Sequence, residues 1–292
     1  MSWETTPIHD RFGVEVHGLQ LAGLTEATFP ALRALFEEHS ALLLRGQEID
    51  DAAHMRVALM FGEIEDRLAD ERKEGEAFEV PKVSNIRDDG SVTGAMDLHT
   101  LNLKANMLWH SDSTFLPVPA LTNILIGRVV TEDGGQTELA STRAGWADMP
   151  EALKNRLRGA AFWHRYSHSR ARIDPELAKL PMFNKWPDQL WRAVWRNPVN
   201  GADALYIASH AYAVAGMDAG EGAALIDEAI SWVTQPQYVY AHTWQPQDVL
   251  IWDQRAVLHR ATPWDYNKPR SLSSICVSVA PSDGVDAMRV IV

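Results

Sequence analysis

The stretch VLIWDQRAVLHRATPWD, residues 249–265, holds two runs whose composition favours β-strands. VLIWD is rich in aliphatic and aromatic residues, as expected of a buried strand, and His259 lies on the second run. Arg270 follows His259 after ten intervening residues. An imidazole on a strand and a guanidinium shortly beyond it make this end of the chain a candidate functional site.

A second histidine motif, WHSDSTF at residues 109–115, places His110 and Asp112 two residues apart. Residues two apart on a strand project to the same side, so these two side chains can chelate one ion while Ser111 points away. With 11 histidines in the chain, a single His-x-Asp triplet can also arise by chance, as a surface contact. His259, 146 intervening residues later, supplies the third ligand that such a site needs.

Two neutral imidazoles and one carboxylate form the ligand set that suits non-haem Fe(II), because they occupy one face of the ion and leave the opposite face open. A zinc hydrolase can use the same three ligand types. The sequence contains no helical HExxH motif in support of hydrolysis. The three residues therefore favour iron.

Hydrophobic periodicity predicts four helices, at residues 29–39, 52–61, 149–158 and 222–233. Strands are predicted for ALLLRG, TNILIGRVV, QTELAST, VLIWD and SLSSICVSVA. EDGG, between the second and third of these runs, is a strong turn signal and predicts a hairpin. The segment AFWHRYSHSRAR, residues 161–172, is interpreted as a strand followed by a loop.

Composition excludes several classes of partner. The net charge of −12, without a long basic cluster, argues against nucleic acid and anionic membranes. The only cysteine, Cys276, rules out an internal disulfide and is expected to be a buried small hydrophobe. No apolar signal sequence or membrane-spanning run is present, so the cytoplasm is the expected location. A single domain is expected, and a homo-oligomer remains possible.

These motifs resemble the iron(II)- and 2-oxoglutarate-dependent dioxygenases of the taurine and 2,4-dichlorophenoxyacetate family. The similarity extends over most of the chain, through LRGQ, SNIR, WHSDSTF, EDGGQTE and VLIWDQRAVLHRATPWD. It implies a mainly β fold with flanking helices, a double-stranded β-helix (jelly roll, cupin-like). It also implies a mobile active-site cover near residues 65–105 and 164–195.

The resemblance implies a role for each matching residue. His110, Asp112 and His259 match the iron ligands, and Arg270 and Thr137 match residues that hold 2-oxoglutarate. The implied reaction uses O₂, converts 2-oxoglutarate to succinate and CO₂, and hydroxylates a substrate C–H bond. Halogenating relatives carry a small residue in place of the carboxylate, so Asp112 favours oxygen insertion.

The substrate is less constrained. Several relatives carry a second arginine four residues after the first, where it meets a taurine sulfonate or a substrate carboxylate. This chain has Ser274 there, so a substrate anion needs another cation. Lys104 and the segment containing His164, His168 and Arg170 are candidates, although a lone lysine such as Lys104 is more often a solvated surface residue. Asn106 and His210 are further candidates for substrate binding, although both can equally be packing residues.

Sequence similarity to the phenoxyalkanoate branch favours an aryloxyalkanoate-like carboxylate as substrate, whose hydroxylation next to the ether oxygen leads to cleavage. A sulfonate, an amino-acid derivative or a natural product is an alternative for the same chemistry. A different class of protein, a non-catalytic jelly-roll module that binds a metal, would have no use for both an open iron face and a cosubstrate arginine.

Overall fold

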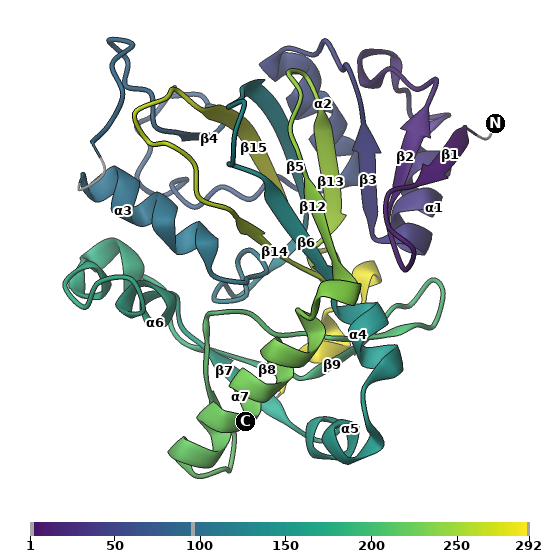
Figure 1. Ribbon diagram of the computed structural model, residues 1–292, viewed down its shortest axis with the longest axis vertical. Coiled ribbons are helices and arrows are strands. Elements are labelled where there is room, and N and C mark those ends of the chain that lie inside the picture. Colours follow the sequence, from purple (N-terminus) through teal and green to yellow (C-terminus); the bar gives the residue numbers. More distant parts are fainter. Residues whose placement is uncertain (1–2, 95–96, 291–292) are drawn as a thin grey trace.

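A seven-stranded sheet forms the upper half of the molecule (Figure 1). The computed structural model describes residues 3–94 and 97–290. In spatial order the strands are β1 (Glu4–Pro7), β2 (Val14–His17), β3 (Ala41–Leu44), β13 (Val249–Asp253), β5 (Ala120–Val129), β15 (Ser271–Ser278) and β4 (Lys82–Ser84). All neighbours are antiparallel except β2 and β3, so strands from both ends of the chain lie side by side.

A three-stranded sheet lies against one face of the large sheet. It consists of β12 (Val239–His242), β6 (Thr137–Ser141) and β14 (Val257–Ala261). Leu139 and Val257 from this sheet share one hydrophobic cluster with Leu43, Leu125 and Leu250 from the large sheet. Because side chains alternate along a strand, every second residue of these strands points into the space between the two sheets.

Two helices, α1 (Phe29–His39) and α2 (Asp51–Phe61), cover the other face of the large sheet (Figure 1). Phe36 and Val57 from these helices pack with Ile251 of β13, and all three side chains are fully buried. The side chain of Asp50 caps α2 by accepting a hydrogen bond from the Ala53 amide at 2.7 Å. The large sheet is therefore buried on both faces.

The chain between β6 and β12 forms a separate layer below the small sheet (Figure 1). Leu225 and Ile226 of its longest helix pack with Ala140 and Leu258 of the small sheet. Its elements are α4 (Thr142–Asp148), α5 (Glu151–Leu157), β7 (Ala161–His164), α6 (Tyr166–Ala171), β8 (Gln189–Arg192), β9 (Val194–Arg196), β10 (Asp203–Leu205), β11 (Ala211–Val214) and α7 (Ala219–Val233). A further helix, α3 (Leu98–Lys104), precedes the His110 segment.

Most of the predicted elements are confirmed. The helices predicted at residues 29–39, 52–61, 149–158 and 222–233 correspond to α1, α2, α5 and α7. The predicted strands correspond to β3, β5, β6, β13 and β15. Within the described residues, no helix combines the length and hydropathy that crossing a membrane requires.

The predicted hairpin between β5 and β6 is wrong. β5 pairs with β13 and β15 in the large sheet, and β6 pairs with β12 and β14 in the small one. Gly134 and Gly135 turn the chain from one sheet to the other, both with positive φ, and a Cβ on Gly134 would lie 2.4 Å from the Pro263 carbonyl oxygen. The turn signal was correct, but both edges of β5 are taken by strands from the distant C-terminal region.

The loop predicted after β7 is also wrong, because residues 166–171 form α6. The residues that this short helix buries are Ser167, Ser169 and Arg170. A helix whose buried face is polar has no apolar periodicity to reveal it.

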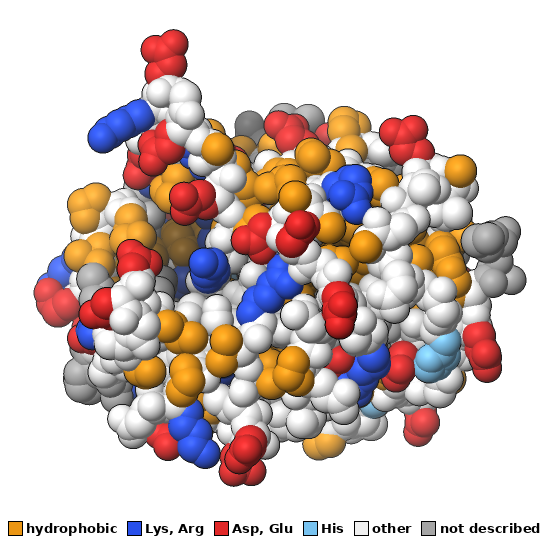
Figure 2. Space-filling view, turned by 90° about the horizontal axis from the view of Figure 1, so that it is seen from above, with side chains coloured by type: hydrophobic (Ala, Val, Ile, Leu, Met, Phe, Trp, Pro, Cys, Tyr) orange, Lys and Arg blue, Asp and Glu red, His pale blue; other side chains and the backbone are white. Residues whose placement is uncertain are grey.

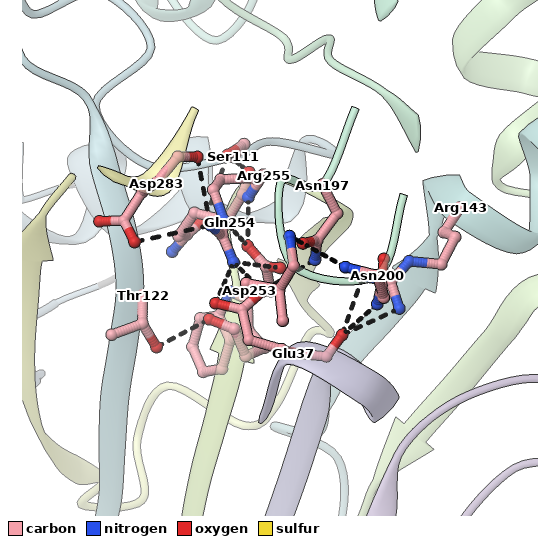
Figure 3. Close-up of polar contacts among 12 residues, drawn as sticks. Glu37, Ser111, Thr122, Arg143, Asn197, Asn200, Asp253, Gln254, Arg255 and Asp283 are labelled. Carbon is pink, nitrogen blue, oxygen red and sulfur yellow. Dashed lines mark hydrogen bonds and ion pairs between the residues drawn. The ribbon is translucent and has the colours of Figure 1, made fainter. Parts of the chain in front are cut away.

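A buried charge network joins α1 to the turn between β13 and β14 (Figure 3). The Arg255 guanidinium donates to Glu37 at 2.8 Å and to Asp253 at 2.8 Å, and its side chain is only 2% exposed. Asp283 lies 3.8 Å from the same guanidinium, and Asn197 donates to Glu37 at 2.8 Å. Arg255 thereby compensates carboxylates from three separate segments.

Replacing Arg255 with Met should destabilise the fold by about 3–5 kcal/mol, because Glu37 and Asp253 would keep buried charges without their main partner. The matched control is Arg156→Met, which removes an ion pair to Glu228 between side chains that are both 49% exposed and should cost about 0–1 kcal/mol. Urea denaturation of each variant measures its free energy of unfolding. Equal effects of the two substitutions would contradict a structural role for the network.

Candidate metal centre

His110, Asp112 and His259 come together between the two sheets, with one ligand atom from each within 4.8 Å of the others. His259 lies on β14, in the alternating set of residues that points inward with Val257. The backbone of His110 pairs with that of His259, through N–H···O bonds of 3.0 and 2.7 Å. This pairing holds the segment that contains His110 and Asp112 against β14, which contains His259. The prediction that one site contains all three side chains agrees with the geometry.

The hydrogen bonds define which nitrogen of His110 faces the site. Nδ1 lies 2.7 Å from the Leu108 carbonyl oxygen, which can only accept, so Nδ1 carries the proton. The lone pair is then on Nε2, which lies 3.8 Å from Oδ1 of Asp112. Nε2 of His259 lies 3.7 Å from Oδ2 of the same carboxylate. Two imidazole nitrogens and a carboxylate converging in this way fit a divalent transition metal, and the set suits Fe(II).

The electrostatics keep these groups in the protonation states that metal binding needs. Burial lowers the pKa of His110, and burial together with the neighbouring His110 lowers the pKa of His259 to about 3. Burial alone would raise the pKa of Asp112, but the nearby His259, His110 and Arg67 lower it overall. The site therefore presents neutral imidazoles beside an ionised carboxylate at neutral pH.

Two amide side chains hold Asp112, and neither was identified from the sequence. Oδ2 of Asp112 accepts hydrogen bonds from Gln254 Nε2 at 2.6 Å and from Asn123 Nδ2 at 3.0 Å. Gln254 Oε1 also accepts from the backbone N–H of Asp112 at 2.9 Å. The available signal was a polar residue within or next to an apolar strand: Asn123 lies in TNILIG, and Gln254 directly follows VLIWD.

Two inward-facing residues of β15 complete the surroundings of the carboxylate. Cys276 is only half-buried, and its Sγ lies 3.6 Å from Oδ2 of Asp112, so the expectation of an ordinary buried hydrophobe is wrong. Ser274 donates from Oγ to Oδ1 of Asn123 at 3.0 Å. Ser274 thus contacts the same Asn123 amide that donates a hydrogen bond to Asp112.

Arg270 and Thr137 both lie next to the turn that contains Gly135, at the beginning of β6. The Arg270 guanidinium is 2% exposed, donates to the Gly135 carbonyl at 2.8 Å and lies 4.8 Å from the Trp264 ring centroid. Burial lowers its pKa to about 10. Thr137 Oγ1 accepts from the Trp244 indole at 3.1 Å, which leaves the Thr137 hydroxyl proton available for an acceptor.

No carboxylate lies within ion-pair distance of Arg270 among residues 3–94 and 97–290. A buried guanidinium without an anion is costly unless a ligand supplies one. Arg270, with a hydroxyl donor two residues beyond its Gly135 contact, therefore forms a candidate site for a carboxylate ligand.

The three candidates for substrate binding lie in different places. His210 is 3% exposed, its ring centroid is 6.4 Å from that of His110, and Nδ1 lies 3.1 Å from Thr114 Oγ1. The Lys104 Nζ lies 5.8 Å from the Tyr266 ring centroid, on the Arg270 side of the site. Asn106 is half-buried in the turn after α3. Their roles in substrate binding stay predictions.

Two of the alternative cations are unsuited to that role. His164 is fully buried, burial lowers its pKa to about 3, and Nδ1 contacts Thr114 Oγ1 at 2.9 Å, so it is neutral. Burial also lowers the pKa of His168, whose ring packs 6.0 Å from Tyr212. Arg170, in contrast, is a buried cation.

The protein family that matches this chain and two of the known proteins that are similar to it are all named as dioxygenases. The family model described as "Taurine catabolism dioxygenase TauD, TfdA family" matches residues 4–276. An (S)-phenoxypropionate/alpha-ketoglutarate-dioxygenase from Sphingobium herbicidovorans is 32% identical over 92% of each chain. An alpha-ketoglutarate-dependent 2,4-dichlorophenoxyacetate dioxygenase from Burkholderia sp. is 31% identical over 93% of each chain. The crystal structure of AAD-2 in complex with Mn(II) and N-oxalylglycine superimposes with a TM-score of 0.89 at 29% identity, covering 96% of this chain and 99% of that one.

Replacing Gln254 with Leu should weaken metal affinity by about 10- to 100-fold, because Asp112 would lose two of the contacts that orient it. Calorimetric titration with Mn(II) under nitrogen measures the affinity. The matched control, Gln237→Leu, changes an exposed glutamine and should leave the affinity unchanged. An unaltered Mn(II) affinity in the Gln254 variant would show that the Gln254 amide does not position Asp112 for metal binding.

Proposed function

Because the chain belongs to the TauD/TfdA family of dioxygenases, we propose that it hydroxylates an organic acid at an Fe(II) centre, with 2-oxoglutarate and O₂ as cosubstrates. The observation that carries the proposal is the convergence of His110, Asp112 and His259 in the same interior that holds Arg270. A protein module that only bound a metal would not need a buried arginine that lacks an anionic partner.

In this proposal Arg270 binds the distal carboxylate of 2-oxoglutarate. A guanidinium presents parallel N–H donors that match the two oxygens of a carboxylate, and the arriving anion compensates the buried charge. Thr137, whose hydroxyl oxygen already accepts from Trp244, donates its proton to the same carboxylate. Trp264 packs against the guanidinium and excludes water from the pair.

The metal ligands have separate tasks. His110 and His259 supply neutral nitrogens, and Asp112 supplies the charge that Gln254 and Asn123 hold in place. Bound Fe(II) would supply the oxygen chemistry by which 2-oxoglutarate becomes succinate and CO₂ while a substrate C–H becomes C–OH. The retained carboxylate at Asp112 supports oxygen insertion rather than halogenation.

The proposed fold is a single domain built on a double-stranded β-helix, or jelly roll, whose two sheets are the seven- and three-stranded ones. We further propose that residues 65–105 and 164–195 form the active-site cover, of which residues 95–96 lie outside the described part of the chain. The Lys185 ammonium contacts Asp70 at 2.7 Å and Glu71 at 2.8 Å, which joins the two segments. Seen from above, the surface on the side of β4 and α3 is hollowed, and hydrophobic and basic side chains are visible in the hollow (Figure 2).

The proposed substrate is an aryloxyalkanoate-like carboxylic acid, the class named for the two relatives above. Hydroxylation of the carbon next to an ether oxygen would give a hemiacetal or hemiketal that collapses, so the bond would break without a second catalytic step. A sulfonate, an amino-acid derivative or a natural product would use the same metal and cosubstrate residues and would differ only in the contacts to its own head group.

Protein loaded with Fe(II) under nitrogen and then given O₂ and 2-oxoglutarate should form succinate faster when phenoxyacetate or a related acid is added, with a matched hydroxylation or cleavage product. Mass spectrometry of succinate and product measures the coupling. The control is Asp112→Ala, which should lose coupled turnover. An absence of 2-oxoglutarate-dependent turnover with every acid and sulfonate tested would contradict the proposed reaction.

Replacing Arg270 with Met should weaken 2-oxoglutarate binding about 100-fold or more, because a buried charge pair would be lost. Calorimetry on the Mn(II)-loaded protein measures this binding. Mn(II) affinity itself should be retained, since Arg270 contacts Gly135 and Trp264 rather than the metal ligands. Unchanged 2-oxoglutarate affinity would remove Arg270 from the cosubstrate site.

A further inference from the structure

Three arginines are buried among the described residues, and they differ in how their charge is compensated. Arg255 is paired with Glu37 and Asp253. Arg270 has no carboxylate partner and is the proposed receptor for 2-oxoglutarate. Arg170, on α6, is 8% exposed and likewise has no carboxylate within ion-pair distance in residues 3–94 and 97–290. The enzyme would bind two acids, and two of these three arginines lack a carboxylate partner among the described residues.

The contacts of Arg170 are all with neutral groups. Nη1 donates to Ser169 Oγ at 3.0 Å and Nη2 donates to the Tyr166 hydroxyl at 3.1 Å. The guanidinium carbon lies 4.5 Å from the Tyr166 ring centroid and 5.2 Å from that of Phe183. Nε is buried without a hydrogen-bond partner. These contacts orient the guanidinium, but they do not neutralise it.

A continuous set of aromatic rings links Arg170 to the metal ligands. The Tyr166 ring stacks on Phe115 with centroids 3.8 Å apart and an interplanar angle of 3°. The His210 ring lies 6.0 Å from Tyr166 and 6.4 Å from His110. Arg170 therefore lies on the His210 side of the metal centre, whereas Arg270 lies on the side of Trp264 and Gly135.

The neighbouring guanidinium of Arg67 already has an anionic partner. Its Nε donates to Glu65 at 2.5 Å, and its Nη2 donates to Ser113 Oγ at 2.9 Å. Ser274, where the family resemblance places a second arginine, is uncharged and is bonded to Asn123. Among the buried residues that the structure describes on the His210 side of the metal centre, Arg170 is the cation without a carboxylate partner.

We propose that Arg170 binds the carboxylate of the organic substrate and takes the place of the arginine that is missing at Ser274. This assignment rests on the proposed function and extends it by naming the substrate's anion receptor. The unpartnered Nε and a terminal nitrogen form one edge of the guanidinium, and such an edge matches the two oxygens of a planar carboxylate. Tyr166 and Trp186, both half-buried with centroids 6.0 Å apart, would contact an aromatic or apolar body attached to it.

The test compares a charged ligand with its neutral analogue. Protein loaded with Mn(II) and 2-oxoglutarate is titrated by calorimetry under nitrogen with phenoxyacetate, with methyl phenoxyacetate and with benzenesulfonate. The variants are Arg170→Met, which removes the charge, and Arg170→Lys, which keeps the charge but not the paired donors. Arg172→Met is the matched control, because Arg172 is exposed and lies two residues away.

Wild-type protein should bind phenoxyacetate more tightly than its methyl ester. Arg170→Met should weaken phenoxyacetate binding about 100-fold and leave the affinity for the ester unchanged, because only the charged head group loses its partner. The phenoxyacetate affinity of Arg170→Lys should lie between those of the wild type and Arg170→Met, and that of Arg172→Met should match the wild type. The unfolding midpoint of the ligand-free Arg170→Met protein should be no lower than that of the wild type, since an uncompensated buried charge has been removed.

Equal weakening of acid and ester in Arg170→Met, or a large fall in its unfolding midpoint, would show that Arg170 is a packing residue and would overturn the assignment. Acid binding that does not depend on Arg170 would overturn it as well. If Arg170-dependent binding favoured benzenesulfonate over phenoxyacetate, the assignment of a carboxylate as the group that Arg170 binds would be overturned. Failure of the proposed function is distinguished separately, because it would appear as absent 2-oxoglutarate binding or absent succinate formation in the unaltered protein.

Discussion

Asp112 has to remain ionised while it lies between two packed β-sheets, and much of the surrounding structure is arranged to satisfy this constraint. Removing a carboxylate from water is unfavourable unless donors and positive charge replace the solvent. The side chains of Gln254 and Asn123 provide the donors, and the metal that fits the site would provide the charge. The inward-facing positions next to the carboxylate are therefore polar, in strands that are otherwise apolar.

The support of Asp112 continues into the main fold through one short turn. Gln254 lies between Asp253 and Arg255, and those two residues belong to the buried charge network with Glu37 (Figure 3). The network attaches the turn to α1, so the amide that holds the metal ligand is anchored to the layer that covers the large sheet. Stability and metal geometry consequently depend on the same three consecutive residues.

The charge of the site is opposite to that of the whole protein. The chain carries a net charge of −12, whereas the buried Arg170 and Arg270 lack anionic partners among the described residues. An acidic surface does not favour binding of nucleic acid, and two isolated interior cations favour small acids that can enter the fold. The two arginines have different neighbours, because Arg170 packs on Tyr166 and Arg270 packs on Trp264, and the proposed function assigns one acid to each.

The sequence by itself determined the three residues proposed as metal ligands, the arginine proposed for the cosubstrate and most of the individual strands and helices. Strand composition placed His259 on β14. His110 lies in an isolated β-bridge and Asp112 in the turn after it, so their side chains converge without the strand geometry expected from their spacing. Only the tertiary structure decided that β5 and β6 lie in different sheets and that Asn123, Gln254 and Cys276 meet at Asp112. It also decided which arginines lack an anion. Periodicity and spacing are local properties of the chain, whereas strand partners, burial and charge compensation depend on residues that are distant in sequence and meet only when the chain folds.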